Sequence, residues 1–315
     1  MIESVLTPTY QVGSVFGTAD ARRNDMKIAP YDENAYKMDH PRGTVAFNYL
    51  LMGGEPDKLE NFRYILGRQE GDFQMPRHRH TFEQIRLPLV GDMNLGEQGI
   101  LHEGEIGYFP EGQTYGPQDD PLGDPKQLQL VLQFGGAAGL GMAAARGRGP
   151  EARRDGEAPR RERREMKFPR PRYQSVLIMN PAHFNWLPLP GADGVERKFF
   201  GSFTERAFWI EYVKVGSGAR WTSSTDAGRR LIVALSGTAT VDDVKIGRLA
   251  ALQVEPGETL NVEATEEMVL FIVGLPPVQL PTVPSDQFDL VTTDGGIEFE
   301  NPRKRAAREA AKVGF

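Results

Sequence analysis

Short runs of alternating or wholly apolar residues recur along the chain, separated by turn-forming residues. Glycine occurs 35 times and proline 23 times among the 315 residues, so the runs are interrupted at short intervals. Runs of this length between turn signals are typical of the strands of a β-sandwich or β-barrel. The pattern predicts an all-β protein, with strands that include 44–52, 62–67, 128–134, 208–213, 230–235 and 268–273.

Helical periodicity is confined to the C-terminal tail. Asn301 would cap a helix there, Pro302 would take its first position, and Gly314 would end it. Charged residues fall on nearly every face of this segment. We therefore expect a short C-terminal helix on the surface, over 303–312.

The composition changes abruptly in the middle of the chain. A stretch rich in glycine and alanine leads into one rich in arginine, with Arg146, Arg148, Arg153, Arg154, Arg160, Arg161, Arg163 and Arg164. A nucleic-acid-binding arm is one interpretation, but acidic residues interleave with the arginines, which favours a solvated linker. We expect an N-terminal barrel with an extension in 1–136, a linker in 137–171, a second barrel in 172–283 and a tail in 284–315.

Charge and composition narrow the classes of partner. The formal net charge is −6, so the protein has no general attraction to nucleic acid or anionic lipid. Cysteine is absent, which excludes disulfides, thiolate metal ligands and thiol nucleophiles. The first residues lack the basic and apolar regions of a secretory signal, and no apolar stretch is long enough to span a bilayer. The sequence predicts a cytoplasmic protein that binds neither nucleic acid nor membrane.

The side chains with the richest chemistry lie in one short stretch. His78 and His80 are two residues apart, so both imidazoles project from the same face of a strand. Gln84 and Arg86 share that parity, whereas Glu83 points to the other face unless a bulge shifts the register. Two imidazoles and an amide oxygen on one barrel wall suit a borderline divalent metal such as iron, manganese, nickel, copper or zinc.

This stretch resembles the cupin superfamily. The first cupin motif, which consists of Gly, His-x-His, Glu and Gly, is matched by Gly71, His78-Arg79-His80, Gln84 and Gly91. The second motif, which consists of Gly, Pro-x-Gly, His and Asn, is matched by Gly104, Pro110-Glu111-Gly112, Tyr115 and Asp119. The glycines, the proline and all but one of the spacings agree. The resemblance implies two tandem cupin barrels, each a double-stranded β-helix or jelly roll.

Two positions depart from the cupin pattern. Gln84 stands where the family usually has glutamate, and Tyr115 stands where it usually has a third histidine. A phenol binds a metal well only when it is deprotonated, and its reference pKa of about 10 makes that costly. We expect one divalent metal, with iron(II) as the first choice, held weakly by His78, His80, Gln84 and Tyr115. A metal-free site that uses a histidine and Tyr115 as acid–base partners is the alternative.

The second half of the chain carries a decayed version of the same motifs. Gly237 takes the place of the glycine that ends the first motif, which puts Arg230 at the glutamate position and Ser224 and Asp226 at the histidine positions. No histidine follows His183, so this barrel lacks the means to bind a metal through imidazole. We expect it to be a structural or dimerising partner, and a homodimer is one assembly that this would allow.

The resemblance implies a small organic substrate that enters the open end of the barrel, but many reactions occur on this fold. Arg86 could hold a carboxylate or enolate oxygen, and Phe82 and Phe109 could form walls for an aromatic ligand. We expect a metal-dependent enzyme of dioxygenase type that acts on a small organic acid or aromatic compound, with Tyr115 and Arg86 as catalytic residues. A non-catalytic binder or sensor, and a metal-free isomerase or epimerase, are the alternatives.

Overall fold

The computed structural model describes residues 26–38, 40, 44–54, 59–139, 142, 163–226, 228–275, 288–294 and 298–299. These residues form antiparallel strands almost throughout, which confirms the predicted all-β class. The helices within this part of the chain are single 3₁₀ turns, at Glu33–Ala35 and Pro181–His183. No helix in the described part is long and apolar enough to cross a membrane.

A large antiparallel sheet forms one wall of the first barrel. It contains, in spatial order, β13 (Leu177–Met179), β9 (Ile106–Phe109), β6 (Phe82–Val90), β11 (Leu128–Gly135), β3 (Phe62–Gln69) and β2 (Val45–Gly53). Three strand pairs complete the barrel: β4 (Phe73–Met75) with β10 (Gln118–Asp120), β5 (His78–Arg79) with β25 (Glu298–Phe299), and β7 (Met93–Asn94) with β8 (Ile100–Leu101).

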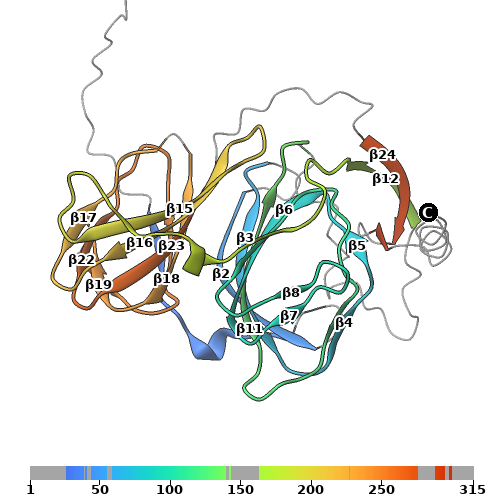
Figure 1. Cartoon of the computed structure of the whole chain (residues 1–315), viewed down its shortest axis with the longest axis horizontal. Coiled ribbons are helices and arrows are strands. Elements are labelled where there is room, and N and C mark those ends of the chain that lie inside the picture. Colours follow the sequence, from blue (N-terminus) through green and yellow to red (C-terminus); the bar gives the residue numbers. More distant parts are fainter. Residues whose placement is uncertain are drawn as a thin grey trace, which may run out of the picture.

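The second barrel repeats this plan. Its large sheet contains β1 (Lys27–Ala29), β21 (Ala251–Val254), β18 (Arg230–Ser236), β23 (Met268–Gly274), β16 (Phe208–Val215), β15 (Val195–Phe203) and β14 (Leu187–Pro188). The opposite sheet contains β17 (Arg220–Thr222), β22 (Asn261–Ala264), β19 (Ala239–Val241) and β20 (Val244–Ile246). Apolar side chains of both sheets, such as Ile232 and Val262, form one core between them. The two barrels lie side by side (Figure 1).

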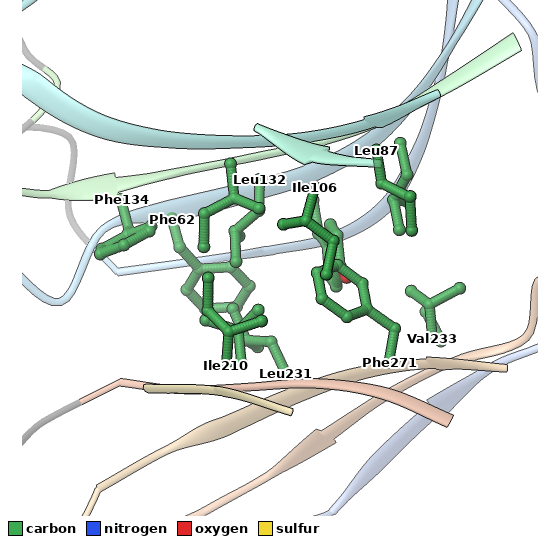
Figure 2. Close-up of a cluster of buried hydrophobic side chains, with 14 of the residues drawn as sticks. Phe62, Leu87, Ile106, Leu132, Phe134, Ile210, Leu231, Val233 and Phe271 are labelled. Carbon is green, nitrogen blue, oxygen red and sulfur yellow. The ribbon is translucent and has the colours of Figure 1, made fainter. Parts of the chain in front are cut away.

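The large sheets of the two barrels pack against each other, and Figure 2 shows the side chains between them. On β16, Phe208, Ile210 and Tyr212 face the first barrel, whereas Val213 and Val215 fill the second barrel. The other central strands alternate in the same way, so both faces of each large sheet are buried. This double burial explains the near-continuous apolar runs in the sequence, because a strand covered on both sides needs apolar residues at successive positions.

Edge strands cross between the barrels. β1, from the N-terminal extension, pairs with β21 of the second barrel, and β13 pairs with β9 of the first barrel. The predicted domain limits of 1–136 and 172–283 place β1 with the first barrel and β13 with the second, whereas each of these strands pairs with a strand of the other barrel. A one-dimensional pattern marks where strands lie but not which sheet supplies their partner.

Part of the predicted linker is a strand. β12 (Arg163–Pro169) pairs along its length with β24 (Phe288–Asp294), which falls in the predicted tail. Residues 143–162, with most of the arginines, and 300–315, with the predicted surface helix, lie outside the described residues.

Candidate functional site

The first barrel places the predicted site residues through strand alternation and one backbone bridge. On β6, Gln84 and Arg86 face the barrel interior, whereas Ile85 and its neighbours of the same parity face the second barrel. His78 pairs directly with Tyr115, because each backbone N–H donates to the other residue's carbonyl at 3.0 Å. The two cupin-like motifs thus meet where His78 and Tyr115 lie side by side.

The Tyr115 hydroxyl is the centre of this arrangement. Its oxygen lies within hydrogen-bonding distance of four side chains that the sequence analysis singled out. The distances are 3.1 Å to His78 Nε2, 2.9 Å to His80 Nε2, 3.2 Å to the Gln84 amide and 3.3 Å to Arg86 Nη2. The structure therefore brings together the four predicted metal ligands and Arg86, and we call these five residues the Tyr115 cluster.

Most of the Tyr115 cluster is enclosed. Tyr115 is 1% exposed, and His78 and Gln84 are also buried, whereas His80 and Arg86 are partly exposed. A ligand that approaches the cluster would therefore meet His80 and Arg86 first.

Two aromatic side chains pack around the cluster. The Phe82 ring stacks on His80 with ring centroids 4.5 Å apart, and the Phe109 ring meets the edge of Tyr115 at 4.7 Å. The Arg86 guanidinium lies 5.0 Å from the centroid of Phe109. The two phenylalanines predicted to form ligand walls thus pack directly on members of the cluster.

The surroundings of the two histidines define where their protons lie. His78 Nδ1 lies 2.7 Å from the Pro76 carbonyl oxygen, which only accepts, so Nδ1 carries the proton and Nε2 accepts from the Tyr115 hydroxyl. Because Tyr115 has a single proton, His80 Nε2 donates to the phenol oxygen. His80 Nδ1 is buried and has no hydrogen-bond partner among the residues described. Burial lowers the pKa of His80 well below its ordinary value, and the positive charge of Arg86 lowers it further. His80 is therefore neutral.

Arg86 supplies the positive charge of the cluster. Its Nη1 donates to Gln118 Oε1 at 3.0 Å, and Gln118 in turn donates to the Asp120 carboxylate at 2.7 Å. When the Gln84 amide is turned so that its oxygen faces Arg86 Nε, 2.8 Å away, the same oxygen lies 3.2 Å from the Tyr115 hydroxyl and is a second acceptor for the phenol proton. Burial raises the pKa of Tyr115, and Arg86 opposes that rise, so the phenol is protonated at neutral pH but its anion has a cation beside it.

The cluster fits a divalent metal in spacing but not in charge. Two ligands about 2.1 Å from one ion and at right angles lie about 3 Å apart, as the Tyr115 oxygen and the imidazole nitrogens do. The charged group at this oxygen, however, is the guanidinium of Arg86. Within the described ranges, no group of three or more His, Cys, Asp or Glu side chains is placed to hold a metal.

Glu83 lies on the opposite face of β6, as strict alternation predicts. It accepts from the Tyr108 hydroxyl and from the backbone N–H of Glu111, both at 2.9 Å, in the core between the barrels. The pairing of β6 with β9 is regular here, so no bulge turns Glu83 toward the histidines. Glu83 is thus not a replacement for Gln84.

A second buried carboxylate accompanies Glu83, and the sequence analysis assigned it no role. Glu111 pairs with Arg172 Nη1 at 2.6 Å and accepts from the backbone N–H of Ala138 at 2.7 Å. Burial raises the pKa of Glu83 to about 7 and that of Glu111 to about 8. The only signal in the sequence was the place of Glu111 inside the Pro-x-Gly motif.

Comparison with known proteins adds evidence on the fold. The sequence matches no protein-family model and no curated protein. A solved candidate dioxygenase from Nostoc punctiforme matches with a TM-score of 0.56 and 13% identity, over 83% of this chain and 87% of its own. A candidate glyoxylate-induced protein from Pseudomonas aeruginosa matches with a TM-score of 0.55 and 9% identity, over 87% of this chain and 97% of its own.

At these identities the likeness concerns the fold alone. It agrees with the two jelly-roll barrels described above. The prediction of the fold is therefore confirmed: the chain consists of two jelly-roll barrels, as the resemblance of its motifs to those of cupins implied.

Proposed function

We propose that the first barrel acts on a small organic acid by proton transfer, with Tyr115 as the group that exchanges the proton. The observation that supports this most is the position of the Tyr115 hydroxyl, 2.9–3.3 Å from four polar side chains. Such a buried phenol between a neutral imidazole acceptor and a guanidinium has both a place to send its proton and a cation to stabilise its anion.

The proposed chemistry follows from the proton positions. Tyr115 would pass its proton to His78 Nε2, and the phenolate would accept hydrogen bonds from Arg86 Nη2 and His80 Nε2. Arg86 would also bind the substrate carboxylate, because it is one of the two partly exposed residues of the cluster. The phenolate would then take a proton from the carbon next to a carbonyl, and the electron pair would move to the carbonyl oxygen as an enolate beside Arg86. Return of the proton by Tyr115 to a neighbouring carbon gives an isomer, and protonation by solvent from the opposite face gives an epimer. No oxidant is consumed in this sequence.

Metal-dependent dioxygenase chemistry on a small acid or aromatic compound is the second candidate. The observation that favours it is the bond between His78 Nδ1 and the Pro76 carbonyl, since metal-bound histidines commonly donate their second ring N–H in this way. His78, His80, Gln84 and Tyr115 would hold the ion, with iron(II) as the first choice, and a bound iron would supply oxygen activation. Gln84→Glu should then raise metal affinity by adding a carboxylate.

Proton exchange with solvent distinguishes the two candidates. The test incubates chelator-treated protein in D2O with a panel of 2-hydroxy, 2-oxo and arylacetic acids. In at least one of them, a proton on the carbon next to the carboxyl or keto group should be exchanged for deuterium. Proton NMR follows the loss of its signal. Tyr115→Phe should slow this exchange at least 100-fold, an effect of the size expected for a lost general acid–base. Tyr64→Phe is the matched control and should leave the exchange unchanged. Tyr64 is a buried tyrosine on a strand of the first barrel, but its side chain lies in the core between the two barrels, away from the Tyr115 cluster.

The other outcomes decide against the proposal. Absence of exchange without metal, together with oxygen consumption after iron(II) is added, would establish the dioxygenase candidate. Saturable binding of an acid with neither exchange nor oxygen consumption would identify a binder or sensor.

A further inference from the structure

A half-open cavity of about 450 Å³ is lined by residues of the second barrel, which was expected from the sequence to be structural, and by the loop 189–192. Its volume falls within the range of about 300–1,000 Å³ that small-molecule sites occupy. It is formed by the inward-facing residues of β16 and β18 and by the loop after β17, and the polar and aromatic members include Trp209, Glu211, Trp221, Ser223, Asp226 and Arg230. The positions that correspond to cupin ligand positions thus line a cavity even though they lack histidine.

Arg230 is the most informative residue of this cavity. It is only 5% exposed, yet its hydrogen-bond acceptors are uncharged. Nη1 donates to Ser223 Oγ at 2.7 Å and to the Ser224 carbonyl at 2.9 Å, and Nη2 donates to the Glu258 carbonyl at 2.6 Å. A guanidinium taken out of water without an anion in contact is costly.

One edge of this guanidinium remains available. Arg230 Nε is buried and has no hydrogen-bond partner in the described part of the chain. Nη2 has two protons and makes one hydrogen bond among the described residues, so a second N–H, on the nitrogen beside the unpartnered Nε edge, is left for a ligand. Two parallel N–H groups on one edge of a guanidinium match the two oxygens of a carboxylate.

The other charged groups of the cavity set its polarity. Arg197 and Arg230 oppose Glu211 and Asp226, so the lining carries no net charge when both carboxylates are ionised. Glu211 lies 3.9 Å from Arg197 Nη1, and burial raises its pKa to about 7. When Glu211 is protonated, the lining carries a net positive charge and favours a single anionic group.

The rest of the lining is apolar and aromatic. Trp209 on β16 pairs with Gly274 on the neighbouring strand β23. A Cβ atom at Gly274 would lie 2.0 Å from the nearest atom of the indole. Trp221 is buried, and Val213 and Ile272 add aliphatic surface. The absence of a side chain at Gly274 leaves room for the indole, which provides a flat wall for an apolar or aromatic ligand body.

We propose that this cavity binds a small monocarboxylate with an apolar or aromatic body, whose carboxylate pairs with the free edge of Arg230. The proposal goes beyond the function proposed for the first barrel and does not depend on it.

Isothermal titration of the full chain with benzoate, phenylacetate and benzamide tests this site. At least one carboxylate should bind saturably with one site per chain, whereas uncharged benzamide should bind at least tenfold more weakly. Arg230→Gln should weaken carboxylate binding at least tenfold. Arg229→Gln is the matched control, because the neighbouring arginine pairs with Glu255 and is not part of the cavity lining.

A second variant guards against a folding artefact at Arg230. Glu211→Gln removes a negative charge from the cavity and should tighten carboxylate binding, a gain that a damaged fold does not produce. Val244→Ala, at an exposed position of the second barrel outside the cavity lining, should leave the affinity unchanged. The proposal is wrong if none of the carboxylates binds at millimolar concentration, or if Glu211→Gln and a folded Arg230→Gln both bind as the wild type does.

Discussion

Single residues in this protein owe their behaviour to the face of the strand on which they lie. Gln84 and Glu83 are neighbours in sequence, but Gln84 joins the Tyr115 cluster and Glu83 is buried between the barrels. The first is a neutral group beside a guanidinium, and the second is a carboxylate in an apolar core. Burial raises the pKa of Glu83 to about 7, against the moderating effects of the Glu111 N–H, the Tyr108 hydroxyl, Arg172 and Arg206.

The raised pKa of Glu83 makes stability depend on pH in a definite direction. The folded state holds the Glu83 proton more tightly than the unfolded chain, so this contribution is full below about pH 4.5 and is lost as the pH rises through about 7. A shift of this size corresponds to on the order of 3 kcal/mol. Glu83→Gln should therefore reduce the loss of unfolding free energy between about pH 5 and 8, measured by urea denaturation.

The control for this measurement is an exposed carboxylate. Glu263 is exposed and pairs with Arg220 on the surface, so Glu263→Gln should leave the pH dependence as it is in the wild type. Equal pH dependence in Glu83→Gln and the wild type would show that Glu83 is ionised in the folded protein.

At the scale of elements, the motif glycines fix how strands and turns meet. Gly104 and Gly112 both have left-handed backbones, with φ of +81° and +76°. A Cβ at Gly104 would meet nothing within 4 Å, whereas a Cβ at Gly112 would lie 2.0 Å from the carbonyl oxygen of Pro169, at the end of β12. Gly112 therefore allows the close approach of a strand that lies outside the motif.

These two glycines form a matched pair for mutation. Gly104→Ala should cost about 1–2 kcal/mol, because only the left-handed backbone is unfavourable for alanine. Gly112→Ala should cost more than that, since the new methyl group also displaces the backbone of β12. Urea denaturation of both variants measures the difference, and equal costs would contradict the contact between Gly112 and Pro169.

At the scale of the whole molecule, the two barrels share one core and exchange edge strands. Phe62 of the first barrel and Ile210 and Phe271 of the second lie in the same buried cluster (Figure 2). β1 and β13 add backbone pairing across the boundary. Barrels joined in this way are expected to unfold together.

Cooperative unfolding can be tested because all three tryptophans, Trp186, Trp209 and Trp221, lie in the second half of the chain. Phe62→Ala removes a fully buried ring from the first barrel and should cost about 3–5 kcal/mol. The tryptophan fluorescence and far-ultraviolet circular dichroism transitions should shift together in urea. Met52→Ala, at a site 55% exposed on the same barrel, should shift neither by much. An unchanged tryptophan transition in Phe62→Ala would mean that the barrels unfold separately.

The sequence by itself determined the all-β class, the main strands of the two barrels and the residues of the Tyr115 cluster, but not the strands β12 and β24 in the predicted linker and tail. Alternation along a strand has a period of two, so the shared face of His78, Gln84 and Arg86 and the opposite face of Glu83 follow from counting. The second motif, and with it Tyr115, was predicted from the resemblance to cupins that the spacing of the glycines and the proline carries.

Only the tertiary structure decided what those residues do to each other and what the second barrel contains. Strand parity does not show that the Tyr115 hydroxyl is the centre of the cluster, because that depends on how two strands from different motifs approach across the barrel. It equally does not show that Arg230 is buried with a free edge beside a cavity, or that β1 and β13 cross between barrels. Distances, burial and strand partners are properties of the packed chain, and local patterns of hydrophobic and polar residues do not contain them.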